Sequence, residues 1–137
     1  MKEKVLEALS ELGFAVEDYG SDCIYSFKFE GINFLYVHNN EDEDFLSLAI
    51  PGIYDIEEEE NLLAYQAMDA INAKLKYVKA NKYENSIWLF YEREIIGEED
   101  VKFALGRMIA HLENAYRQFH CAAESDGEAA EADSESE

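Results

Sequence analysis

The amino-acid sequence predicts an α+β domain in which helices pack on an antiparallel five-stranded sheet, in the order α-β-β-β-α-β-β-α. Two observations lead to this prediction. Several short stretches alternate apolar with polar residues and follow one another across turns, as strands joined in hairpins do. Three other stretches repeat apolar residues every three or four positions, which is typical of amphipathic helices. Runs of strands combined with separate helices favour the α+β class.

The first helix and the first two strands are predicted as follows. Residues 2–12 place Val5, Leu9 and Leu12 on one side of a helix. Residues 22–29 are predicted to form a strand, because Cys23, Tyr25, Phe27 and Phe29 share one face, and residues 32–38 are predicted to form the next strand. The pair Glu30-Gly31 between them has the length of a tight hairpin turn.

The third strand is followed by an acidic run, Asp55–Glu60, which is predicted to begin the second helix. Residues 45–50 form the strand, and Pro51-Gly52 is expected to end it. Asp55 is a suitable N-cap with Glu58 three positions later, so the helix is predicted to begin there and run to about Lys76. Glutamates in a first turn also face the positive end of the helix dipole.

The last two strands are predicted at residues 77–82 and 86–93. A final helix follows Gly97, and its apolar stripe runs from Val101 to Phe119. Residues 121–137 contain no large apolar residue and no base, so we expect a disordered acidic tail. We therefore expect one domain over residues 1–120 and a tail over 121–137.

The charge of the chain excludes some partners. It has 31 acids, 11 Lys and Arg residues and a net charge of −20. Seven acids lie in residues 121–137, so residues 1–120 hold 24 acids and 11 bases, a net of −13. Nucleic acids and anionic membranes attract basic surfaces, so we expect neither as a partner. A basic protein is the natural charge partner.

Two further features favour a cytoplasmic location. Glu3, Glu7 and Glu11 interrupt any signal-peptide core, and no apolar run reaches the length of about 18 residues that a membrane span needs. Cys23 and Cys121 lie far apart and show no CxxC spacing, as is typical of free cytoplasmic thiols.

No stretch carries a complete catalytic or metal-binding motif. The loop NNEDED at residues 39–44 begins like a calcium loop, but Phe45 and Pro51 stand where glycine and glutamate are required. Glu57 and Glu60 alone in the acidic run could converge on an ion, and we favour a helix start over a metal site there. His38, His111 and His120 have no paired spacing, and no nucleophile elbow or phosphate loop occurs. We therefore expect no catalytic residue, metal or cofactor.

Surplus apolar residues are the strongest functional signal. Ile87, Leu89 and Tyr91 face one side of the last strand, and Trp88 and Phe90 face the other. Phe103 points away from the stripe of its helix. Either helix 2–12 or a loop covers the second sheet face, or that face binds a partner or a second copy. On the second interpretation the partner-binding residues are Trp88, Phe90 and Phe103.

The chain resembles the type III secretion chaperone fold, including its YbjN-like relatives, over residues 2–119. The resemblance rests on element order, on strong acidity and on three short segments: Leu12-Gly13, Pro51-Gly52 and Trp88-Leu89-Phe90. It implies a homodimer that binds a segment of another protein without catalysis or a cofactor. The YbjN-like branch implies regulation. The acidic tail lies outside the pattern.

The sequence thus predicts a non-enzymatic, cytoplasmic, homodimeric protein-binding module. The alternative is an acidic inhibitor or immunity protein that neutralises a basic protein. A third alternative is a small enzyme or ligand-binding protein with convergent carboxylates in a cleft. The identity of the partner, the choice between chaperoning and regulation, and the role of the tail stay open at this point.

Overall fold

A computed structural model of the chain describes residues 1–21, 23–56 and 61–124. It confirms the α+β class with an antiparallel sheet, whose strand order is β1-β2-β3-β4-β6-β5. The elements are α1 (Lys2–Glu11), β1 (Glu17–Ser21), β2 (Ile24–Phe29), β3 (Ile32–Val37), β4 (Phe45–Asp55), α2 (Asn61–Lys74), β5 (Lys79–Tyr83), β6 (Ser86–Glu94) and α3 (Val101–Glu124).

The sheet has six strands, so the prediction of five is wrong. The additional strand is β1, which pairs antiparallel with β2 at the edge of the sheet. Its sequence, EDYGS, has no apolar alternation, because its residues are exposed where the structure describes their burial. The strand exists because β2 offers it backbone partners, and such pairing leaves no pattern in side chains that face water.

Strand β4 continues through Pro51-Gly52, so the prediction that this pair ends the strand is also wrong. Between Ile50 and Tyr54 the strand advances four residues while its partner β6 advances two, from Leu89 to Ile87. This bulge accommodates the proline, which lacks a ladder donor.

The prediction that Asp55 is the N-cap of the second helix is also wrong, because β4 extends as far as this residue. Asp55 is the last residue of β4, where it pairs with Ser86 of β6, and the described part of α2 begins at Asn61. The acidic positions 57–60, including the predicted capping residue Glu58 and the pair Glu57 and Glu60, lie outside the described residues.

The last helix begins at Val101, after the acidic residues 98–100 that we expected at its start, and it ends later than expected. The Oδ1 atom of Asp100 accepts a hydrogen bond from the Phe103 backbone N–H at 3.2 Å, which is the geometry of an N-cap. The helix α3 continues to Glu124, so residues 121–124, which we placed in the acidic tail, are helical. Residues 125–137 lie outside the described part of the chain.

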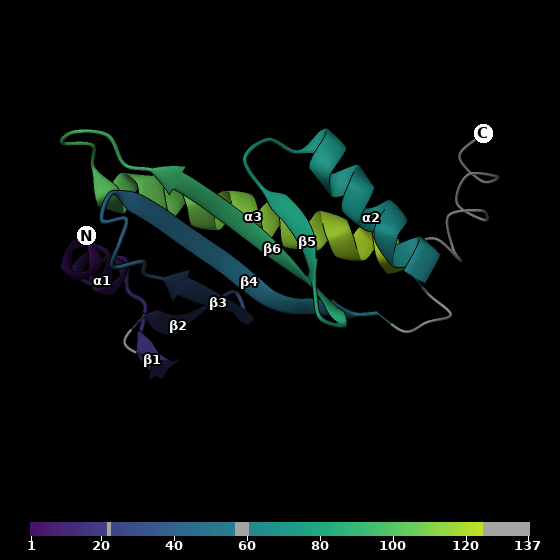
Figure 1. Cartoon of the computed structure of the whole chain (residues 1–137), viewed down its shortest axis with the longest axis horizontal. Helices are drawn as coiled ribbons and strands as arrows, with labels where there is room; N and C mark the ends of the chain where they lie inside the picture. The colour runs from purple at the N-terminus through teal and green to yellow at the C-terminus, as the bar shows by residue number, and fades with distance from the viewer. Residues whose placement is uncertain (22, 57–60, 125–137) are drawn as a thin grey trace.

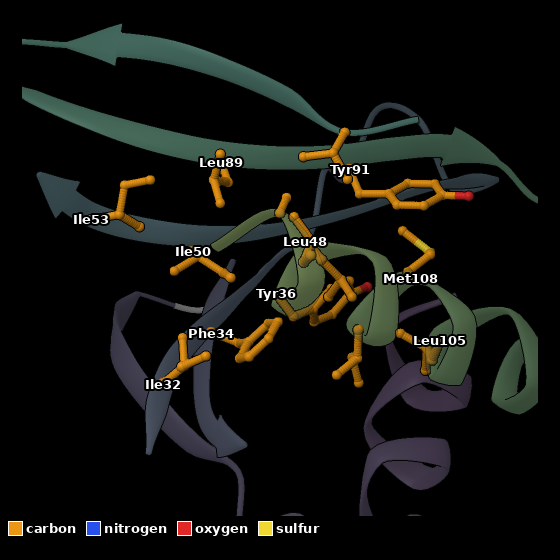
Figure 2. Close-up of a cluster of buried hydrophobic side chains, with 14 of the residues drawn as sticks. Ile32, Phe34, Tyr36, Leu48, Ile50, Ile53, Leu89, Tyr91, Leu105 and Met108 are labelled. Atoms are coloured by element: carbon orange, nitrogen blue, oxygen red, sulfur yellow. The ribbon is translucent and has the colours of Figure 1, made fainter. Parts of the chain in front are cut away.

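The three helices pack on one face of the sheet. Helix α3 runs along β4 and β6, α1 packs beside it near its N-terminal end, and α2 packs beside it and against β5 (Figure 1). The buried core lies between these helices and the inward-facing side chains of the strands. Figure 2 shows part of it, with Phe34, Leu48 and Leu89 from three strands and Leu105 and Met108 from α3 in one buried cluster. All five side chains are fully buried, which makes this layer the main source of stability.

Candidate functional site

The second face of the sheet has no helix packed on it in the described part of the chain. The alternative that helix 2–12 covers this face is wrong, because α1 packs beside α3 on the first face. The pairing register places Leu35, Ala49, Phe90 and Lys79 side by side on β3, β4, β6 and β5. Three apolar side chains, Leu35, Ala49 and Phe90, therefore lie in a row on the open face, and Lys79 ends the row at the β5 edge.

Trp88 lies two residues before Phe90 on β6, and therefore on the same face of the sheet. Its ring stacks on Phe90 at a centroid distance of 6.0 Å and contacts the ring of Tyr83 at 5.2 Å. The indole Nε1–H donates a hydrogen bond to Ser86 Oγ at 3.2 Å. The rings of Trp88 and Phe90 thus form a small aromatic platform. The hydrogen bond to Ser86 fixes the orientation of the Trp88 indole.

The four residues Leu35, Ala49, Trp88 and Phe90 are here called the open-face cluster. Leu35 is 3% exposed and Ala49 is fully buried, although no helix lies above them. The larger neighbours shield them, while Trp88 and Phe90 stay partly exposed. Ordered, partly exposed aromatics over a buried apolar base are typical of protein-binding surfaces.

Phe103 lies on another surface. It belongs to α3 and is 66% exposed, and it borders a hollow of about 460 Å³ with Leu12 and Gly106. Because α3 packs on the first face of the sheet, Phe103 and the open-face cluster lie on opposite sides of the sheet. The three residues that we predicted as one set of partner-binding positions therefore divide into two surfaces.

The edge of the sheet at β5 is closed by Asn72 of α2. The backbone N–H of Ala80 donates to Asn72 Oδ1 at 2.7 Å, and Asn72 Nδ2 donates to the Ala80 carbonyl at 3.1 Å. At Ala80 the side-chain amide thus occupies the backbone positions that an added strand would use. An unprotected edge strand can pair with a strand of another chain. Because Asn72 occupies the backbone groups of Ala80, we expect a partner at this end of the sheet to bind the face and not the edge.

The calcium-like loop is a turn between β3 and β4. Asn39 Oδ1 accepts from the Glu41 backbone N–H at 2.9 Å, and the Asn39 carbonyl accepts from the Asp42 N–H at 3.1 Å. Its polar side chains hold the turn, as Asn and Asp commonly do. Within residues 1–21, 23–56 and 61–124, no three His, Cys, Asp or Glu side chains gather in a way that could hold a metal ion.

The three histidines lie in separate places: His38 donates its backbone N–H to the Cys23 carbonyl at 2.7 Å, and His120 directly precedes Cys121 on α3. His38 is buried beside the Tyr36 hydroxyl, His120 packs on Tyr116, and His111 contacts Tyr77 and Tyr91. Cys23 is half-buried in the turn before β2, outside the strand in which we placed it, and Cys121 is exposed on α3. Neither Cys23 nor Cys121 forms a disulfide bond within the described residues.

Comparisons with solved structures identify the fold. A protein of unassigned function from Methanothermobacter thermautotrophicus aligns with a TM-score of 0.67 at 14% identity, over 90% of this chain and 96% of that one. YbjN from E. coli, described as a candidate transcription regulator, aligns with a TM-score of 0.59 at 13% identity, over 93% of each chain.

These structural alignments establish a YbjN-like fold. Because the sequence identities are only 14% and 13%, they establish nothing beyond the fold. No family model matches the sequence, and no curated protein matches it. In the described residues no helix is long and apolar enough to cross a membrane.

Proposed function

We propose that the chain is a non-enzymatic protein-binding module whose open-face cluster binds an apolar segment of another protein. The observation that carries the proposal is the aromatic platform of Trp88 and Phe90 beside the buried Leu35 and Ala49, on a face without a covering helix in the described residues. Large rigid aromatics supply contact area at a low cost in conformational entropy, which is why they dominate binding hot spots.

The closure of the β5 edge supports binding on the face. With Ala80 satisfied by Asn72, an incoming segment gains little from backbone pairing at this edge. Affinity then comes from side chains that cover Trp88 and Phe90. Because apolar contacts are insensitive to salt, the complex should persist at high ionic strength.

The module is a homodimer in this proposal, and the surface around Phe103 is its interface. Glu11 and Asp100 balance Lys102 and Arg107 around this patch, so it is locally neutral on a chain with a net charge of −20. Two copies of so acidic a chain repel each other least where such a patch meets its own copy. The separation of Phe103 from the open-face cluster leaves the latter available for the partner.

The regulatory description of YbjN is compatible with this function if regulation acts through protein contacts. The acidic surface disfavours direct contact with DNA. The second candidate, an inhibitor that neutralises a basic protein, rests on the same acidic surface. It differs in salt dependence, since charge-driven binding weakens steeply as ionic strength rises.

A pull-down from native lysate at low and high salt tests these alternatives. The proposal predicts one partner that survives high salt and is lost when Trp88→Thr and Phe90→Thr are combined, with Tyr65→Thr on the exposed surface of α2 as the control. A basic partner that dissociates in salt and is indifferent to Trp88 and Phe90 would favour the inhibitor. Light scattering on the Phe103→Ser variant tests the dimer, because that change should yield a monomer while the open-face double variant stays dimeric.

A further inference from the structure

A partly polar hollow, separate from the open-face cluster, lies on the helix-covered side of the sheet. Tyr77 lies between α2 and β5, Tyr91 belongs to β6, and Arg107 and His111 are one turn apart on α3. Together with Glu92 and Arg93 of β6 they line a hollow of about 370 Å³. This volume is within the range of small-molecule sites, which starts near about 300 Å³.

Tyr77 is the unusual residue of this hollow. Its backbone has a φ of +73°, a left-handed conformation in which glycine is the usual residue after a helix. Glu30 and Glu84 also have positive φ, but both lie in two-residue hairpin turns, where this conformation is required. A bulky residue in this conformation is strained, and such strain tends to be retained where the side chain has a function.

The strained backbone presents the Tyr77 ring to the hollow. The ring stacks on Tyr91 with centroids 5.6 Å apart and planes 13° apart, and its centroid lies 5.3 Å from that of His111. Tyr77 itself is 64% exposed, so the outer part of this aromatic wall is accessible to a ligand. A flat ring can lie against such a wall.

Tyr91 contributes an unpartnered polar group. Its side chain is among the buried residues at 7% exposure, and its hydroxyl forms no hydrogen bond within the described residues. In Figure 2 the ring extends along the margin of the core with the hydroxyl pointing away from Leu48 and Leu89. Burial raises the pKa of Tyr91, while Arg93 and Arg107 act in the opposite direction. The hydroxyl is therefore protonated near neutral pH and can donate a hydrogen bond to a ligand.

The charges around the hollow favour an anion. Arg93 is held by Glu99, since its Nη2 donates to Glu99 Oε1 at 2.6 Å. The Glu92 carboxylate accepts from Ser47 at 3.2 Å, and it lies one position along β6 from Tyr91, on the other face of the sheet. Arg107 forms no ion pair in the part of the chain that the structure describes. The guanidinium of Arg107 is thus left to bind a carboxylate.

We propose that Tyr77, Tyr91, Arg107 and His111 form a binding site for a small aromatic carboxylate. The ring of the ligand stacks on Tyr77, and its carboxylate accepts hydrogen bonds from Arg107 and the Tyr91 hydroxyl. This site is independent of the open-face cluster, which lies on the other face of the sheet. Arg107 also borders the Phe103 patch, so this site stands or falls separately from the open-face cluster but shares one residue with the proposed dimer interface.

Titration of the ¹⁵N-labelled full chain with benzoate, followed by NMR, tests the site. We expect saturable shifts centred on Tyr77, Tyr91 and His111 in the millimolar range. Benzamide lacks the charge and cyclohexanecarboxylate lacks the aromatic face, so each should bind at least about tenfold more weakly. Equal binding of benzoate and benzamide, or shifts scattered over the surface, would overturn the proposal.

Two variants assign the roles of the residues. Arg107→Gln should weaken benzoate binding by about tenfold or more, whereas Arg117→Gln, the matched change further along α3, should leave it unchanged. Tyr77→Gly removes the ring and accepts the same backbone conformation without strain, so it should stay folded by circular dichroism and lose benzoate binding. Retention of full affinity in either Arg107→Gln or Tyr77→Gly would contradict the assignment.

Discussion

The closure of the β5 edge by Asn72 leads to a quantitative prediction. Replacing Asn72 with alanine removes two hydrogen bonds, both to backbone groups of Ala80, a residue with no exposed surface. A hydrogen bond contributes about 0.5–1.5 kcal/mol net, and an unsatisfied buried group costs somewhat more. Because Asn72 lies at the surface, water can replace part of the loss. The change should therefore lower the free energy of unfolding by about 2 kcal/mol.

Urea denaturation followed by circular dichroism measures this loss, and hydrogen exchange of the Ala80 amide reports on the same contact. Asn81→Ala is the matched control, since Asn81 is exposed on the same strand and its side chain has no hydrogen bond within the described residues. It should change the stability by less than about 0.5 kcal/mol. If Asn72→Ala behaves like the control, or if the Ala80 amide keeps its protection, then Asn72 does not close the edge.

Three further changes probe the packing and the charges. Burial, and to a smaller extent the nearby Glu43, raises the pKa of Tyr36. The unfolded chain therefore loses the Tyr36 proton at a lower pH than the folded chain, and the free energy of unfolding should fall as pH rises above about 10. In urea denaturation at several pH values, Tyr36→Phe should make this fall with pH less steep. Asp100→Ala should cost about 1 kcal/mol in thermal or urea unfolding through the lost N-cap, whereas Asp100→Asn should cost little. Leu105→Ala should cost about 2–5 kcal/mol, and Phe103→Ala, two positions earlier on α3, less than about 0.5 kcal/mol; a large loss at Phe103 would show that its ring serves the fold.

The elements with strong side-chain periodicity could be predicted from the sequence. The stripe of α3 and strand β2 have this property, because their buried residues recur every three or four positions on α3 and every second position on β2. The placement of Trp88 and Phe90 opposite Leu89 and Tyr91 follows from the same period of two. This part of the candidate site was therefore accessible without a structure.

Features that depend on pairing through space could not be predicted in this way. Strand β1 and the end of β4 are stabilised by backbone partners, and the bulge at Pro51-Gly52 becomes visible only against β6. Leu35 and Ala49 join the open-face cluster because of sheet register, and Asn72 reaches Ala80 across a turn. Tyr77 has no sequence signal at all, since its importance lies in a backbone angle.

A photo-crosslinking amino acid placed at position 90 tests the central claim most directly. Incorporated in place of Phe90 in the full chain, p-benzoylphenylalanine should crosslink in cells to a segment of another protein, at high as well as low salt. The same group in place of Tyr65, an exposed residue of α2, is the control and should not capture that protein. Capture from position 65 and none from position 90 would contradict the account, since the open face of the sheet would then not be the surface that meets the partner.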